Sequence, residues 1–246
     1  MPPLILILPY LVQALLIVHV IKTGRNQLWI WVLLFAPFGV GGLAYLLVEI
    51  LPELFRSRAA RRTARSFRKA IDPGADLRRY ESEARVAGNV ATRQRYAEEL
   101  VRHGRYEEAI AQYRETLNGL YEHDPNLMLG LAQAQFGKGD AHAARTTLDE
   151  LIRINPEFRS PAGHLLYARA LEAEGEVARA LEEYRALAPS YPGAEASVRY
   201  AQLLKAQGRQ AEAQQVAREL LDGARIAPGH YRRAQREWLE AAQRLL

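Results

Sequence analysis

The stretch GRYEEAIAQYRETL, residues 104–117, joins a glycine to helix-forming residues with an apolar side chain at every third or fourth position. Glycine accepts backbone angles that other residues resist, so Gly104 predicts a turn that leads into an amphipathic helix. A short amphipathic helix is stable only when its apolar face packs against a partner. The copies of this stretch elsewhere in the chain therefore decide the fold.

Glycines recur with separations of 35, 36 and 33 residues, at Gly104, Gly139, Gly175 and Gly208. Alanine stands five positions after and seven positions before each glycine, and a tyrosine or leucine stands eight positions before it. Small side chains at fixed positions let two antiparallel helices touch, while the large one fills the space beside them. Prolines near the repeat ends separate one helix pair from the next, at Pro125, Pro156, Pro192 and Pro228.

This pattern resembles the tetratricopeptide repeat, a helix-turn-helix unit of 34 residues that stacks into a solenoid. The resemblance covers residues 90–225 and implies an all-α solenoid of about four repeats with flanking helices. The repeats are expected at 90–124, 125–160, 161–193 and 194–227, within a domain of residues 75–246 that ends in a capping helix at 229–246. The chain departs from the family where a later consensus alanine is Thr116, Leu151, Leu187 and Leu220.

The first 55 residues are almost entirely apolar and contain only Lys22, Arg25, Glu49 and Glu53 as charged residues. A helix needs about 20 residues to cross a hydrocarbon core of about 30 Å. The apolar runs 4–21 and 28–51 predict two spans, and hence a two-helix transmembrane hairpin anchor at 1–55. A secretory signal is disfavoured because no basic segment precedes the first run and no small-residue cleavage site follows it.

The stretch RNQLWIWVLLFAPFGVGGLAY, residues 25–45, resembles the N-terminal two-helix membrane module of phospholipase D-type cardiolipin synthases. Those enzymes carry their chemistry in paired H-x-K-x(4)-D motifs. None of the six histidines of this chain is followed by lysine two positions later. The resemblance therefore implies a membrane hairpin without the phosphodiesterase.

A basic connector at 56–74 follows the apolar segment. Its cations predict contact with lipid head groups, or a signal that stops translocation, and the two readings are compatible. Basic residues after the second span outnumber those between the spans, which predicts a multi-pass protein of the bacterial inner membrane with both termini in the cytoplasm. The predicted head-group contacts are Arg56, Arg58, Arg61, Arg62, Arg65, Arg68 and Lys69.

The tetratricopeptide resemblance implies a ligand groove lined by the first helix of each pair. Basic residues outnumber acidic ones among the groove positions, which suggests an acidic or C-terminal peptide ligand. A merely solvated wall remains an equally open interpretation. The groove positions are Arg95, Glu98, Arg102, Leu129, Gln133, Phe136, Leu165, Arg169, Arg199, Gln202 and Lys205.

Enzyme chemistry has no support in the sequence. The chain has no cysteine and none of the usual nucleotide, metalloprotease or nucleophile-elbow motifs, so we expect no catalytic residues, cofactor, metal or small-molecule substrate. The net charge of +5 comes from one short segment, which disfavours nucleic-acid binding.

The function predicted from sequence is a membrane-anchored scaffold or adaptor that binds a partner protein or peptide in a cytoplasmic solenoid. One alternative is a periplasm-facing assembly chaperone similar to cytochrome c maturation factors. Another is an accessory protein of a lipid enzyme that acts through the hairpin.

Overall fold

The computed structural model describes residues 14–22, 28–35, 48, 72 and 74–246. The chain divides into two compact units, residues 1–75 and residues 76–246. The described part contains helices and turns and no strand.

In the first unit, residues 14–22 are helical and a second helix, α2, spans Leu28–Phe35. Val20 and Leu33 are both 1% exposed and pack together, with Leu16 and Trp29 among the apolar side chains around them. The two helices therefore share a small apolar core.

The predicted localisation as a multi-pass inner-membrane protein is wrong. Within the described residues, no helix combines the length and the apolar character that a membrane crossing requires. At about 1.5 Å per residue, the eight residues of α2 extend for only about 12 Å, against a hydrocarbon core of about 30 Å. The prediction rested on the apolar runs 4–21 and 28–51, of which the structure describes residues 14–21, 28–35 and 48.

Much of the predicted hairpin, 1–13, 23–27, 36–47 and 49–55, lies outside the described residues. The predicted head-group contacts between residues 56 and 69 also lie outside them. Nothing in the described part supports the likeness to the cardiolipin synthase module or an interaction with lipid.

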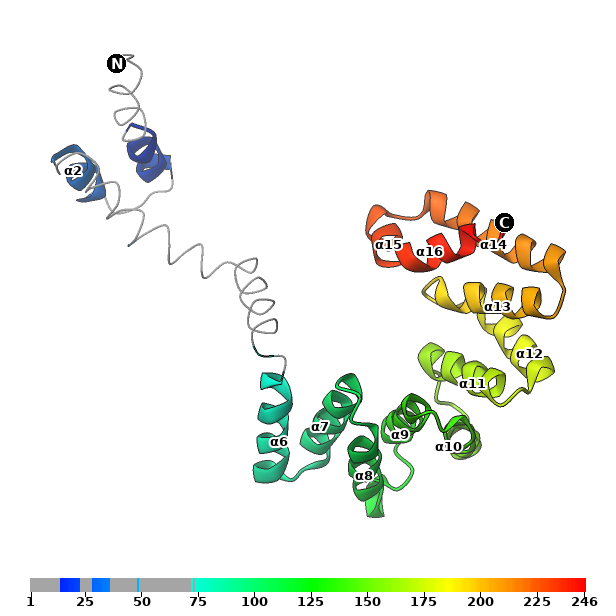
Figure 1. Ribbon diagram of the computed structural model, residues 1–246. Helices are drawn as coiled ribbons and strands as arrows, with labels where there is room; N and C mark the ends of the chain where they lie inside the picture. The colour runs from blue at the N-terminus through cyan, green and yellow to red at the C-terminus, as the bar shows by residue number, and fades with distance from the viewer. Residues whose placement is uncertain (1–13, 23–27, 36–47, 49–71, 73) are drawn as a thin grey trace. The chain divides into compact units, whose positions relative to one another are not determined.

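The second unit is a stack of helices that follow one another in chain order (Figure 1). It begins with α6, Ala75–Ala87, which precedes the first helix pair. Four helix pairs follow: α7 (Val90–Arg102) with α8 (Tyr106–Thr116), α9 (Pro125–Lys138) with α10 (Ala141–Ile154), α11 (Pro161–Ala173) with α12 (Val177–Leu187), and α13 (Glu195–Ala206) with α14 (Gln210–Ile226). A short 3₁₀ helix, η2, spans Gly119–Tyr121.

The C-terminal stretch forms two helices, α15 (Gly229–Ala234) and α16 (Arg236–Gln243), where the sequence predicted one capping helix. The break falls at Gln235, whose side-chain oxygen accepts a hydrogen bond from the backbone N–H of Ala194 at 3.0 Å. Helix α16 packs on α13 and α14. The last helix pair is therefore covered along its outer side.

The glycines have the predicted role in the turns between paired helices. Their φ angles are positive at 72°, 95°, 82° and 76° for Gly104, Gly139, Gly175 and Gly208, a conformation in which a Cβ atom is strained. In the first pair, for example, Gly104 N–H donates to the carbonyl oxygen of Val101 and closes the end of α7.

The alanines of the repeat have the predicted burial. None of the eight is more than 1% exposed: Ala97, Ala109, Ala132, Ala144, Ala168, Ala180, Ala201 and Ala213. With only a methyl group at these positions, the backbones of neighbouring helices approach closely. The Gly/Ala spacing therefore sets the contact surface, or seam, between the helices, which stays the same from pair to pair.

Helices α8 and α9, of the first and second pairs, approach each other closely. A Cβ atom added to Gly130 in α9 would lie 2.4 Å from the ring of Tyr113 in α8. Tyr113 is 2% exposed and fills the space against that backbone. The apolar core runs from α6 to α9 in one cluster and from α9 to α16 in a second, and Leu117 packs against both.

Candidate functional site

The predicted groove positions lie on the first helix of each pair, and we call the surface they form the first-helix face. Exposed members are Arg95, Arg102, Gln133, Gln202 and Lys205, and half-buried members are Glu98, Leu129, Phe136, Arg169 and Arg199. Leu165 is 5% exposed and belongs to the apolar core. Leu165 therefore packs in the core and does not contribute to the groove surface.

At the N-terminal end of this face, Arg102 in α7 contacts two carboxylates. It pairs with Glu98 at 3.8 Å and forms a closer ion pair with Glu99. Glu99 is buried, with 3% of its side chain exposed, and it also lies 3.4 Å from His103. The sequence interpretation took Arg102 as a cation available to a ligand, but Arg102 mainly neutralises the buried Glu99.

Near the C-terminal end, two predicted cations lie on aromatic rings from other helices. The guanidinium of Arg169 in α11 lies 4.7 Å from the ring centre of Phe136 in α9. The guanidinium of Arg199 in α13 lies 5.3 Å from the ring centre of Trp238 in α16. Stacking on an aromatic face holds an arginine in place by cation–π attraction while its N–H groups point outward from the ring edge.

One carboxylate joins the two arginines. Glu195 Oε1 accepts from Arg199 Nε at 2.7 Å and lies 3.9 Å from Arg169 Nη1. We call Phe136, Arg169, Glu195, Arg199 and Trp238 the arginine cluster. Two guanidinium groups and one carboxylate give it a net charge of +1, and its residues come from α9, α11, α13 and α16.

Two tyrosines, Tyr184 and Tyr191, lie close enough to the cluster to interact with the charges of Arg169 and Arg199. Burial, and then the nearby Glu195 carboxylate, raise the pKa of Tyr191. Tyr184 O–H donates to Glu172 Oε2 at 2.6 Å, and burial followed by this hydrogen bond raises the pKa of Tyr184. Glu172 is therefore engaged in the fold rather than free to bind a ligand.

Sequence reasoning missed Glu195 and did not place Trp238 on this face. The spacing of Glu195 and Arg199 is four residues, which on a helix predicts the observed ion pair. Nothing in the sequence brings Trp238 next to Arg199, because 39 positions separate them. Only the packing of α16 on α13 creates that contact.

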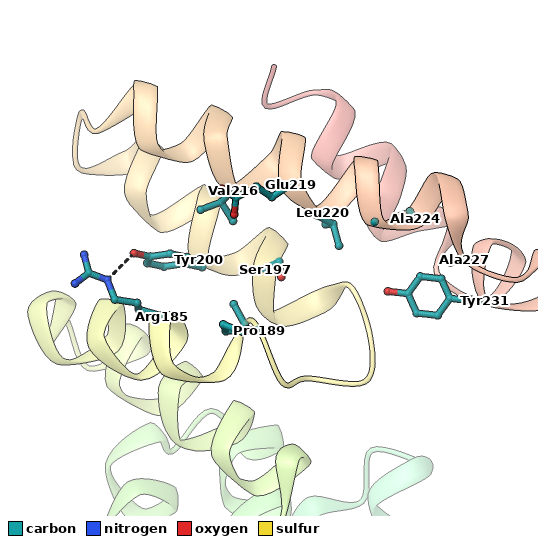
Figure 2. Close-up of a pocket in the computed structure, with 12 residues that line it drawn as sticks. Arg185, Pro189, Ser197, Tyr200, Val216, Glu219, Leu220, Ala224, Ala227 and Tyr231 are labelled. Atoms are coloured by element: carbon teal, nitrogen blue, oxygen red, sulfur yellow. Dashed lines mark hydrogen bonds between the residues drawn. The ribbon is translucent and has the colours of Figure 1, made fainter.

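On the side of the second helices, small pockets recur at one register position. Figure 2 shows the pocket of about 480 Å³ formed by α12, α13 and α14, in which Arg185 Nε donates to the hydroxyl of Tyr200 at 3.2 Å. Val216 and Leu220 of α14 line one wall, and Tyr231 of α15 lies at the far end from Arg185 (Figure 2).

The equivalent pocket formed by α10, α11 and α12 is larger, about 650 Å³, and Tyr167 takes the place of Tyr200. Tyr167 O–H donates to Asp149 at 2.8 Å, and His164 lies 2.7 Å from Glu183 at the same pocket. A third, more charged pocket of about 300 Å³ contains Tyr96. The recurrence follows from the tyrosine eight positions before the glycine, but the other lining residues differ each time.

Metal chemistry finds no support in the part of the chain that the structure describes. There, no three side chains of His, Asp or Glu come together in a way that could hold an ion. The arrangement of the arginine cluster is instead suited to binding an anion.

Residues 100–170 match the tetratricopeptide repeat family. The crystal structure of a thermophilic tetratricopeptide repeat protein from Thermus thermophilus is similar over 68% of this chain and 88% of its own, with a TM-score of 0.52 and 19% identity. The helical stack is a tetratricopeptide-type solenoid. The crystal structure of the MamA protein is similar to it over 59% of this chain and 79% of its own, with a TM-score of 0.50 and 19% identity.

No curated protein sequence matches this chain significantly. The likeness to solved structures therefore establishes the solenoid fold, and the fold agrees with a scaffold for protein interactions. What this solenoid binds must be argued from its own side chains.

Proposed function

We propose that this chain is a non-catalytic scaffold whose tetratricopeptide solenoid, residues 75–246, binds an acidic segment of a partner protein on the first-helix face. The arginine cluster is the observation that carries the proposal. It is the place on this face where two cations are held close together, each stacked on an aromatic ring.

The cluster has the properties of an anion site. The side chains of Arg169 and Arg199 are 33% and 25% exposed, so solvent reaches the guanidinium groups. Arginine offers five N–H donors in a planar fork that matches a carboxylate, and such charge-assisted bonds are about twice as strong as neutral ones. Because the rings already restrict both side chains, little further rotamer entropy is lost when a ligand binds.

The rest of the face suits an extended polypeptide. Gln133, Gln202 and Lys205 are exposed on α9 and α13, where they can donate hydrogen bonds to a peptide that passes the cluster. Phe136 and Trp238 are half-buried and offer apolar surface beside the two cations. An acidic segment that also carries apolar side chains is therefore the ligand class that we propose.

Charge reversal tests this proposal. The double variant Arg169→Glu/Arg199→Glu should bind an acidic peptide at least about tenfold more weakly, because charge-assisted hydrogen bonds contribute roughly 1.5–3 kcal/mol each. The probe is a fluorescein-labelled peptide that alternates Glu with Phe and Ala, and the measurement is fluorescence anisotropy at fixed salt.

The matched control is Arg153→Glu/Arg218→Glu, which makes the same change of charge at exposed positions on the second helices α10 and α14. Circular dichroism should show unchanged helix content in both double variants. Equal loss of binding in the control would mean that the change in net charge explains the effect, and it would contradict a site at the arginine cluster.

A further inference from the structure

We propose that Glu195 is an internal competitor, a carboxylate of the chain itself that occupies the place of the ligand's carboxylate between Arg169 and Arg199. The inference rests on the proposed function, because it concerns the same site. It adds a chemical selection rule, since only an anionic group can replace Glu195 without leaving the two arginines unpaired.

The contacts of Glu195 are those of a weakly held ligand. Both contacts use one oxygen, Oε1, with a hydrogen bond of 2.7 Å to Arg199 Nε and an ion pair of 3.9 Å to Arg169. The longer distance exceeds that of a hydrogen bond. The outer N–H groups of Arg199 and the N–H groups of Arg169 therefore remain available to a second carboxylate.

The arginines do not depend on Glu195 for their positions. Phe136 and Trp238 each contact one of the two guanidinium groups, and neither ring comes from the helix that carries Glu195. Trp238 is fixed because α16 packs on α13 and α14. The cation pair would thus stay in place if Glu195 turned away.

Release of Glu195 is not expensive for the fold. Its side chain is 21% exposed, so the carboxylate can turn toward water without crossing a packed core. Glu195 also lies in the first turn of α13, where the helix dipole favours a negative charge in any rotamer. The ion pair that it forms with Arg199, four residues on, is of the kind that contributes little stability on exposed helices.

The competition sets the specificity. A neutral amide or hydroxyl ligand would displace a carboxylate and leave two cations without a counter-charge, whereas a ligand carboxylate restores the pairing. The carboxylate can come from an Asp or Glu side chain or from the C-terminus of a chain. The chemistry is shared, so the experiment must separate the two sources.

The test measures peptide affinity of the full chain with Glu195→Gln and Glu195→Ala. Removal of the competitor should tighten binding of the Glu-containing fluorescein peptide by about two- to fivefold, as expected when a partly exposed ion pair no longer has to be broken. Glu195→Ala also removes the side-chain oxygen that the glutamine variant keeps as a hydrogen-bond acceptor. Glu182→Gln, an exposed glutamate on α12, is the matched control and should leave the affinity unchanged.

Three peptides identify the source of the carboxylate: one with internal Glu and an amidated end, one with Gln in place of Glu and a free end, and one with neither carboxylate. The gain from Glu195→Gln should appear with at least one of the first two and not with the third. Unchanged or weaker binding of all carboxylate peptides by both Glu195 variants would overturn the inference.

The inference and the proposed function fail in different ways. If Arg169→Glu/Arg199→Glu abolishes binding while the Glu195 variants do not tighten it, the groove stands and Glu195 is only a positioning residue, which overturns the inference alone. If the arginine reversal has no effect, the site itself is wrong. Thermal unfolding by circular dichroism verifies that each variant is folded.

Discussion

The seams between helices and the first-helix face differ in how strictly the chain repeats. In the seams, the alanines at fixed positions are at most 1% exposed in every pair. On the first-helix face, equivalent positions change from pair to pair, and only the last three pairs and α16 contribute to the arginine cluster. Because each pair contacts mainly its neighbours, the fold requires only the seams to be constant, and the exposed face is free to vary.

The largest effect should follow from a change in a seam. We expect Gly130→Ala to destabilise the chain by about 2 kcal/mol, because the new methyl group would overlap the ring of the buried Tyr113. Urea unfolding, followed by the helix signal in far-ultraviolet circular dichroism, measures the change in the free energy of unfolding.

Gly223→Ala is the matched control in helix α14, since no atom lies within 4 Å of its added Cβ. Alanine is favoured over glycine in a helix by roughly 0.8–1 kcal/mol, so this variant should be more stable than the natural chain. Equal destabilisation by both substitutions would show that close helix contact does not explain Gly130.

A medium effect is expected where a seam side chain reaches toward the first-helix face. Tyr184→Phe removes the hydroxyl that donates to Glu172, and should cost about 1.5 kcal/mol at neutral pH. Because burial raises the pKa of Tyr184, the phenol stays protonated in the folded chain while it ionises near pH 10 in the unfolded chain. The stability that the phenol contributes is therefore complete below pH 10 and declines above it.

The measurement is the free energy of unfolding of both forms between pH 8 and about pH 11. The difference between the natural chain and Tyr184→Phe should shrink above pH 10, by at most about 1.4 kcal/mol per pH unit. A difference that stays constant over this range would contradict a raised pKa for Tyr184.

The smallest effect is expected for an ion network away from the seams. Glu174 accepts from Arg145 and from His142, the latter at 2.8 Å. Burial acts to raise the pKa of Glu174, but the hydrogen bonds from Arg145 and His142 outweigh it and lower the pKa. A lowered pKa means that the stabilisation is present above the unfolded-state pKa, near 4.3, and is lost as the pH falls through the folded-state value.

Glu174→Gln should therefore cost less than about 1 kcal/mol at pH 7, because surface ion pairs contribute little. The variant and the natural chain should converge in stability as the pH falls below about 4, as measured by thermal unfolding. A difference in stability that grows as the pH falls would contradict a lowered pKa for Glu174.

The N-terminal unit shows where the sequence interpretation failed. Apolar runs of 18 and 24 residues met the length criterion for membrane spans, yet no helix among the described residues is long and apolar enough to be one. Hydropathy reports which side chains avoid water, but it does not specify what covers them. Val20 and Leu33 satisfy that preference by packing against each other.

For the candidate site, the sequence predicted the helix face but not the pairing on it. Register assigned Arg169 and Arg199 to the groove, and the structure shows both partly exposed on first helices. The same reasoning treated them as free cations. Their partners Phe136 and Trp238 come from neighbouring helices, so the contacts depend on how the pairs stack.

The sequence alone determined the helical pairs, because glycine turns and buried alanines are local requirements that each repeat must meet in the same way. Only the tertiary structure decided which charges remain available. The cation–π contacts, the shared Glu195 and the burial of Glu99 depend on distances between helices that no spacing along the chain specifies. An electrostatic site is set by separation in space, whereas a repeat is set by separation in sequence.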